Sequence, residues 1–144
     1  MNKIEHLTKL LMLHDKKEQN LILKAIACKK YLDEELRKLN LLESCLQEYK
    51  LKLKSTKNGL TSFTYQQYYA FFNQLDKAII QQKDSVARSR EVHLKWLKEI
   101  EAVRKKREGL KKLITKEKTL QQIKMDKREN QLATDIFNQL KPRT

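Results

Sequence analysis

Residues 55–63 read Ser-Thr-Lys-Asn-Gly-Leu-Thr-Ser-Phe and separate two long heptad patterns. Before this break, an alternating count of three and four gives fifteen positions, of which twelve are apolar or tyrosine: Ile4, Leu7, Leu11, His14, Glu18, Leu21, Ala25, Cys28, Leu32, Glu35, Leu39, Leu42, Leu46, Tyr49 and Leu53. After it, ten of fourteen positions are apolar: Tyr68, Phe72, Leu75, Ile79, Gln82, Val86, Ser89, His93, Trp96, Ile100, Val103, Arg107, Leu110 and Ile114. Such a stripe buries itself against another helix, so two stripes around one break predict an antiparallel hairpin.

The composition agrees with this architecture, because the chain has only two glycines and one proline among 144 residues and 35% of its residues are charged. We predict an all-α fold, a long antiparallel two-helix coiled coil with a C-terminal helical overhang. The chain should form one domain over residues 1–144, with a helix over 3–54, a turn over 55–63 and a helix over 64–139. Folding back at Gly59 places residue i near residue 118 − i, so the segment after about residue 115 has no facing residues.

The turn and the start of the second helix have local signals. Asn58-Gly59 favours a turn, in which Gly59 supplies a positive φ. Thr64 can cap the second helix with Gln67 as its capping-box partner, and Ser62 or Thr61 could cap it one turn earlier.

Several function classes lack sequence support. No uncharged stretch is long enough to span a membrane and no signal peptide begins the chain, so we expect a cytosolic protein. The three histidines are scattered and no glycine-rich phosphate loop or nucleophile motif occurs, so we expect neither catalysis nor a metal or other cofactor. Cys28 and Cys45 are too far apart on one helix for a disulfide and are expected to be structural thiols.

The net charge of +14 points to an anionic partner, which could be nucleic acid, a membrane surface or an acidic protein. The charge is densest over residues 104–112, a cluster that is either a solvated face or a contact for an acidic partner. Nucleic acid is less favoured, because no aromatic residue lies between Trp96 and Phe137 for base stacking.

Two segments carry apolar residues outside the predicted seam. Near the turn, six aromatic residues gather at Tyr49, Tyr65, Tyr68, Tyr69, Phe71 and Phe72. Of these, Phe71, Tyr65 and Tyr69 lie off the seam and should be partly exposed, which favours a protein-binding surface over a simple closure of the hairpin end. In the overhang, residues 120–140 carry apolar side chains at near-helical spacing. An amphipathic helix without an internal partner either frays or docks elsewhere, and docking on a partner is the favoured interpretation.

The chain resembles the FliJ family of the flagellar type III export apparatus. The resemblance covers roughly residues 30–140 and is carried by Tyr49-Lys50-Leu51-Lys52-Leu53, Asn58-Gly59-Leu60-Thr61-Ser62 and Tyr68-Tyr69-Ala70-Phe71-Phe72-Asn73-Gln74-Leu75-Asp76-Lys77-Ala78-Ile79. It implies a non-enzymatic cytoplasmic stalk at the inner-membrane base of the apparatus. Its implied partners are the export ATPase hexamer, the export gate membrane protein and export chaperones, without nucleic acid and without membrane insertion.

The resemblance also implies two binding surfaces. Contact with the gate falls on Leu42, Tyr49, Phe71, Leu75 and Ala78. The terminal end, which would enter or cap the ATPase ring, holds Arg104, Lys105, Lys111, Lys112, Leu120, Ile123, Leu132, Ile136 and Phe137. The chain departs from the family pattern at Lys38, Cys45 and Gln82. The alternatives are the equivalent stalk of a virulence injectisome, a basic coiled-coil arm that binds nucleic acid, and a plain coiled-coil dimeriser.

Overall fold

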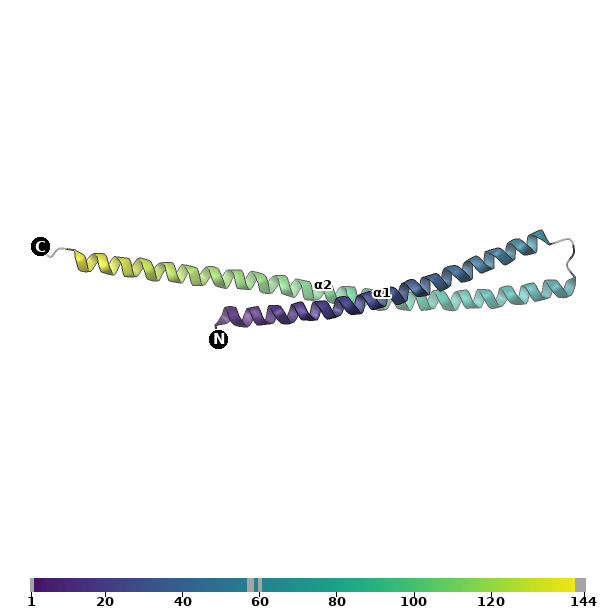
Figure 1. The fold of residues 1–144 in the computed structure, drawn as a ribbon, viewed down its shortest axis with the longest axis horizontal. Coiled ribbons are helices and arrows are strands. Elements are labelled where there is room, and N and C mark those ends of the chain that lie inside the picture. The colour runs from purple at the N-terminus through teal and green to yellow at the C-terminus, as the bar shows by residue number, and fades with distance from the viewer. Residues whose placement is uncertain (1, 57–58, 60, 142–144) are drawn as a thin grey trace. The chain divides into compact units, whose positions relative to one another are not determined.

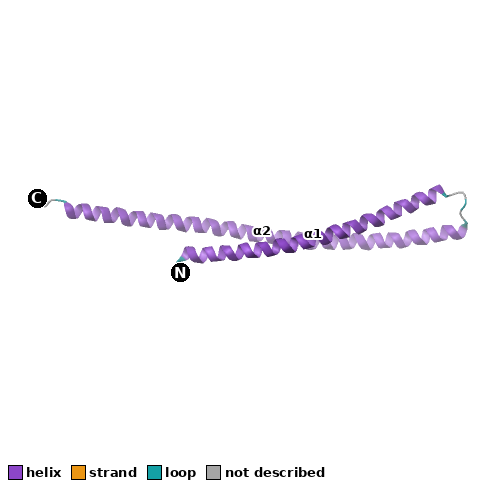
Figure 2. Cartoon of the chain, viewed as in Figure 1, coloured by secondary structure: helices purple, strands orange, loops and turns teal. Residues whose placement is uncertain are grey.

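The computed structural model of the chain describes residues 2–56, 59 and 61–141, and these residues are almost entirely helical. Helix α1 spans Lys3–Ser55 and helix α2 spans Ser62–Leu140 (Figure 1). The described residues include no strand, and those outside the two helices are loop or turn (Figure 2). Within the described part of the chain, no helical window is apolar and long enough for a membrane span. The predicted all-α class is confirmed.

The helix ends are set by short polar side chains. The side chain of Asn2 accepts a hydrogen bond of 2.8 Å from the Glu5 amide and caps α1. At the start of α2, the Thr61 hydroxyl accepts a bond of 3.3 Å from the Thr64 amide. The cap is therefore Thr61, and the predicted start at Thr64 is two residues late. Gly59 has no positive φ, so that part of the turn prediction is wrong, and Asn58 lies outside the described residues.

The residues cluster into two compact units, one of which is Leu21–Glu99. Its buried apolar side chains all occupy predicted heptad positions: Leu21, Ala25, Leu32, Leu75, Ile79 and Val86. Three contacts between the helices lie within two residues of the predicted facing positions: Lys24 with Trp96, Glu35 with Gln82, and Tyr49 with Phe71. The predicted antiparallel pairing is thus confirmed in this unit, while the single-domain count stays a prediction.

The other unit contains Met1–Asn20 and Ile100–Thr144. Ile100 and Val103 are buried at predicted seam positions, and Lys3 forms an ion pair of 3.6 Å with Glu117. Beyond Glu117, every described residue of α2 except the half-buried Gln121 is exposed. The predicted C-terminal overhang is therefore present in this unit.

Candidate functional site

The aromatic surface, which we define as Tyr49, Tyr65, Tyr68, Tyr69, Phe71 and Phe72, joins the two helices near the turn. The rings of Tyr49 on α1 and Phe71 on α2 have centroids 4.7 Å apart and planes tilted by 57°. Phe71 also lies 6.4 Å from Phe72, whose ring is 6.1 Å from that of Tyr68. These tilted pairs have the spacing that favours aromatic contacts, so the rings support one another along α2 and, through Tyr49, between the two helices.

Part of this aromatic surface is open to solvent. Phe71 is 36% exposed, Tyr69 is also exposed and Tyr65 is half-buried, as their positions off the seam predict. A hollow of about 340 Å³ opens beside Tyr49 and Phe71, and Thr64, Gln67 and Tyr68 complete its lining. An apolar hollow framed by partly exposed rings can receive an apolar side chain of a protein partner.

The residues expected to contact the gate do not all reach the surface. Leu42, Tyr49 and Ala78 are half-buried at the helix pair, and Phe71 is exposed beside Tyr49. Leu75 is only 8% exposed and belongs to the core. It can hold the helices in register beneath the surface, but its side chain has little area left for a partner.

A polar pair, the buried Glu35 on α1 and the half-buried Gln82 on α2, joins the two helices farther from the turn than the aromatic surface. The amide of Gln82 donates hydrogen bonds to the backbone oxygen of Glu35 at 2.9 Å and to its carboxylate at 2.7 Å. The Lys38 ammonium donates a third bond of 3.2 Å to the same carboxylate. The bond from Gln82, more than the nearby Lys38, holds the pKa of Glu35 below its ordinary value, although burial opposes this shift. Lys38 and Gln82, two departures from the family pattern, thus share one partner.

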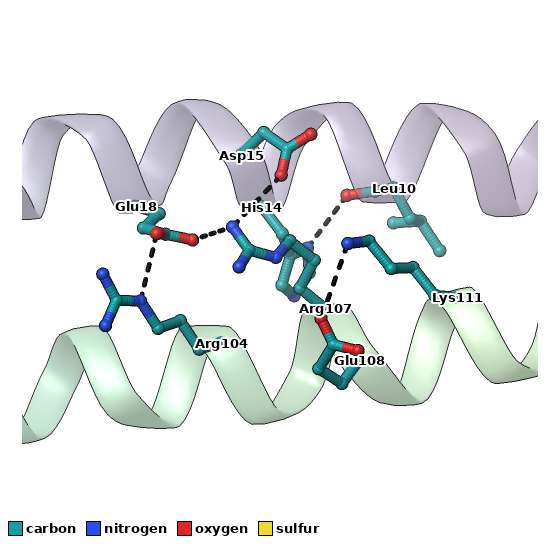
Figure 3. Close-up of polar contacts among 8 residues, drawn as sticks. All are labelled: Leu10, His14, Asp15, Glu18, Arg104, Arg107, Glu108 and Lys111. Carbon is teal, nitrogen blue, oxygen red and sulfur yellow. Dashed lines mark hydrogen bonds and ion pairs between the residues drawn. The ribbon is translucent and has the colours of Figure 1, made fainter.

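The terminal surface comprises the nine residues expected to bind the ATPase ring, and its cations differ in what they contact. Arg104 donates a bond of 3.1 Å to Glu18, which is only 7% exposed (Figure 3). Arg107 donates a second bond to Glu18 and lies 3.6 Å from Asp15. The sequence places Glu18 and Arg107 in the two seams, but it does not predict that they pair. The available signal for this ion cluster was an acid in one seam and a base in the other, with predicted levels one heptad apart.

Two other cations of the terminal surface form ion pairs within their own helix. Lys105 lies 3.7 Å from Glu101, and Lys111 lies 3.5 Å from Glu108. Both pairs and Lys112 are exposed to solvent. Exposed pairs of this kind contribute little to stability, so these lysines can exchange their partners for acidic groups of another protein. Arg104, by contrast, already holds the two helices together.

The apolar residues of the terminal surface are open to solvent along the overhang. The exposed side chains are Leu120, Ile123, Leu132, Ile136 and Phe137, with Met125 and Leu140 beside them. They follow Glu117, the last residue of α2 that forms an ion pair with the described part of α1. A helix with this much exposed apolar surface has the character of a docking element.

The described residues contain no group of three or more histidine, cysteine, aspartate or glutamate side chains that could hold a metal ion. The His14 ring nitrogen Nδ1 lies 2.9 Å from the backbone oxygen of Leu10, as in a residue that satisfies its own helix. Cys28 and Cys45 are free and half-buried.

Comparison with known protein families matches residues 2–141 to the family described as flagellar FliJ protein. The chain belongs to the FliJ family. This match spans both helices and both candidate surfaces. It identifies the chain as a component related to flagellar protein export. Searches of curated proteins and of solved structures found no match.

Proposed function

We propose that this FliJ-family chain is a non-enzymatic stalk that couples the export ATPase ring to the export gate. The observation that carries the proposal is the exposed overhang of α2, where the apolar side chains of the terminal surface follow a dense cluster of cations. Apolar residues can enter a subunit groove while the lysines pair with acids at its edge. Family membership supplies the context in which the partner is the export ATPase.

The coupling follows from symmetry. A single helix pair in the centre of a six-fold ring cannot contact all six subunits alike. The subunits that it touches are stabilised in one conformation, whereas the subunits that it does not touch are unaffected. The contact therefore biases the nucleotide states of the touched subunits, or the assembly of the ring. The chain needs no reactive group for this role, because its effect is a difference in binding free energy between conformations.

The aromatic surface is the second half of the proposal and binds the gate. Its support is the hollow beside Tyr49 and Phe71 together with the exposed ring of Phe71. A chain bound to both partners is peripheral at the inner-membrane base of the flagellar export apparatus. Export chaperones are the third proposed partner class, and they would be held close to the ATPase and the gate while the chain is bound to both.

A pull-down from a detergent-solubilised cell lysate, which contains both cytosolic and membrane proteins, tests the assignment of the ATPase and the gate. The tagged full chain should retain the export ATPase, and a chain that ends at residue 119 should not. A matched chain with Phe71→Ala should retain the ATPase but lose the gate protein, because only its aromatic surface is changed. If the full chain retains nucleic acid in place of the ATPase, and a nuclease releases it, the stalk proposal is wrong.

A further inference from the structure

A second hollow lies on the flank of the Leu21–Glu99 unit, between α1 and α2, and none of its lining residues belongs to the aromatic surface. It has a volume of about 510 Å³. Four small side chains line it: Cys28 and Ser89 form its floor, and Ser85 and the exposed Ala27 lie beside them. Small residues face one another here, so the helices leave space that leucine or isoleucine would fill elsewhere in the seam. We call this feature the small-residue groove.

The rim of the small-residue groove is apolar where a two-helix coiled coil usually carries charge. Tyr31 is 57% exposed and Val92 is 47% exposed, and both lie beside the seam. One heptad to either side of Tyr31, the equivalent positions are Lys24 and Lys38. Positions beside a two-helix seam are normally charged, but of the seven residues that line the groove Arg88 alone is charged, so the lining leaves uncharged surface on which a third helix can pack.

The charge around the small-residue groove selects the kind of helix. On this flank, the positions around the groove include the cations Lys24, Lys38, Arg88 and Lys95 and the acids Glu34, Asp84 and Glu99. The cations are in slight excess here, and the whole chain carries a net charge of +14. Lys24 and Lys95 place their ammonium groups 4.8 Å and 5.8 Å from the Trp96 ring, near one end of the groove. A second copy of the chain would bring the same excess of cations to the contact and would be repelled, whereas an acidic helix would be attracted.

Arg88 is the residue of the groove that can bind a carboxylate of an acidic helix directly. It lines the groove, and it forms an ion pair of 3.3 Å with Asp84 of the same helix. Both side chains of that pair are largely exposed, so the pair contributes little to stability and Arg88 can turn to an incoming carboxylate. Arginine also binds carboxylates in a two-point geometry that lysine does not offer.

We propose that the small-residue groove binds an acidic amphipathic helix of a partner protein as the third helix of a local three-helix bundle. Large apolar side chains of that helix fill the space above Cys28 and Ser89, and a carboxylate on its edge pairs with Arg88. This site is separate from both surfaces assigned above, and it stands whether or not the ATPase and the gate are partners.

The two cysteines allow a direct test in the intact full chain. The probe is a synthetic helix three heptads long, with leucine at the a and d positions and glutamate at the positions that flank them. Maleimide labelling of each thiol is measured by peptide mass spectrometry with and without the probe. Cys28 lies in the groove floor, and Cys45 lies outside the groove and serves as the internal control. We expect labelling of Cys28 to slow severalfold while that of Cys45 is unchanged.

Matched variants and a matched peptide complete the experiment. Ala27→Glu places a bulky anion in the groove and should abolish the protection of Cys28. Ala87→Glu makes the same change at an exposed alanine outside the groove and should leave the protection intact. A peptide with lysine in place of glutamate should not protect Cys28. The proposal is overturned if the basic peptide protects equally well, if Ala27→Glu has no effect, or if Cys28 becomes protected merely when the chain itself is concentrated.

Discussion

The ring of Tyr49 on α1 lies 4.7 Å from the ring of Phe71 on α2, and the latter is partly exposed at the edge of a hollow. Phe72, its neighbour in the sequence, occupies a predicted seam position and is half-buried. Two adjacent phenylalanines thus have different tasks: one shapes a surface, and the other packs between the helices.

This difference gives the first prediction. Phe71→Ala should weaken binding of the gate protein and lower the unfolding free energy only by about 0.5–1.5 kcal/mol, the value of a partly exposed aromatic pair. Phe72→Ala should cost more, up to the lower end of the about 3–5 kcal/mol measured for buried phenylalanine. Thermal melts and gate titrations of both variants measure the two effects. A larger loss of stability in Phe71→Ala would show that the assigned seam is wrong.

The ion cluster of the terminal unit gives the second prediction. Glu18→Ala should lower the unfolding free energy by about 1–3 kcal/mol, because it removes the carboxylate that Arg104 and Arg107 share and leaves the half-buried guanidinium of Arg107 with only the more distant Asp15. The double variant Glu18→Leu and Arg107→Leu should recover most of that loss, since apolar pairs can replace buried ion pairs. Urea denaturation of the wild type, Glu18→Ala, the matched single variants Glu18→Leu and Arg107→Leu, and the double variant provides the measurement. Additive losses in the double variant would contradict a direct coupling of the two residues.

The pair of Glu35 and Gln82 gives a prediction for pH. The folded-state pKa of Glu35 is lowered from an ordinary value of 4.5, so its stabilising effect is complete above that value. It is lost as the pH falls through the lower, folded-state pKa. Melting temperatures measured from pH 7 downward should therefore fall less steeply for Glu35→Gln than for the wild type below pH 4.5. Parallel curves would mean that Glu35 has no part in the acid sensitivity.

The exposed lysines of the terminal surface give the fourth prediction. Lys105→Glu together with Lys112→Glu should weaken binding of the ATPase, more strongly at low salt than at high salt, because exposed charges are screened over about 10 Å at 0.1 M. Lys30→Glu together with Lys98→Glu reverses the same amount of charge in the other unit and should have a much smaller effect. Arg104 is left unchanged, since its reversal would also break the contact with Glu18. Equal losses for the two double variants would indicate attraction to the net charge alone.

The sequence predicts the helices well because heptad periodicity reports directly on which side chains are buried. Leu21, Leu32 and Val86 occupy predicted seam positions and are buried. Partner choice among polar seam residues is harder to predict, as the contact of Glu18 with Arg104 and Arg107 shows, because long side chains reach over about one helical turn. Which residue caps the start of α2 depends on the orientation of a single hydroxyl group. The sequence offers threonine at both Thr61 and Thr64, so residue type alone does not show which one is the cap.

The small-residue groove was not predicted, and the reason is geometric. Neither Ala27 in one helix nor Ser85 in the other is unusual by itself. A hollow forms only when the register of the two helices brings their small side chains to the same level. The aromatic surface was easier to predict, because its rings are large and lie within a short segment near the turn.

The central claim is that the overhang of α2 acts on the export ATPase, and ATP hydrolysis by the purified ATPase tests it most directly. The full chain should stimulate hydrolysis, whereas a chain of residues 1–119 should not. That shorter chain should keep its melting temperature, because the removed apolar residues are exposed and contribute little to the core. A folded 1–119 chain that stimulates the ATPase as strongly as the full chain would contradict the account.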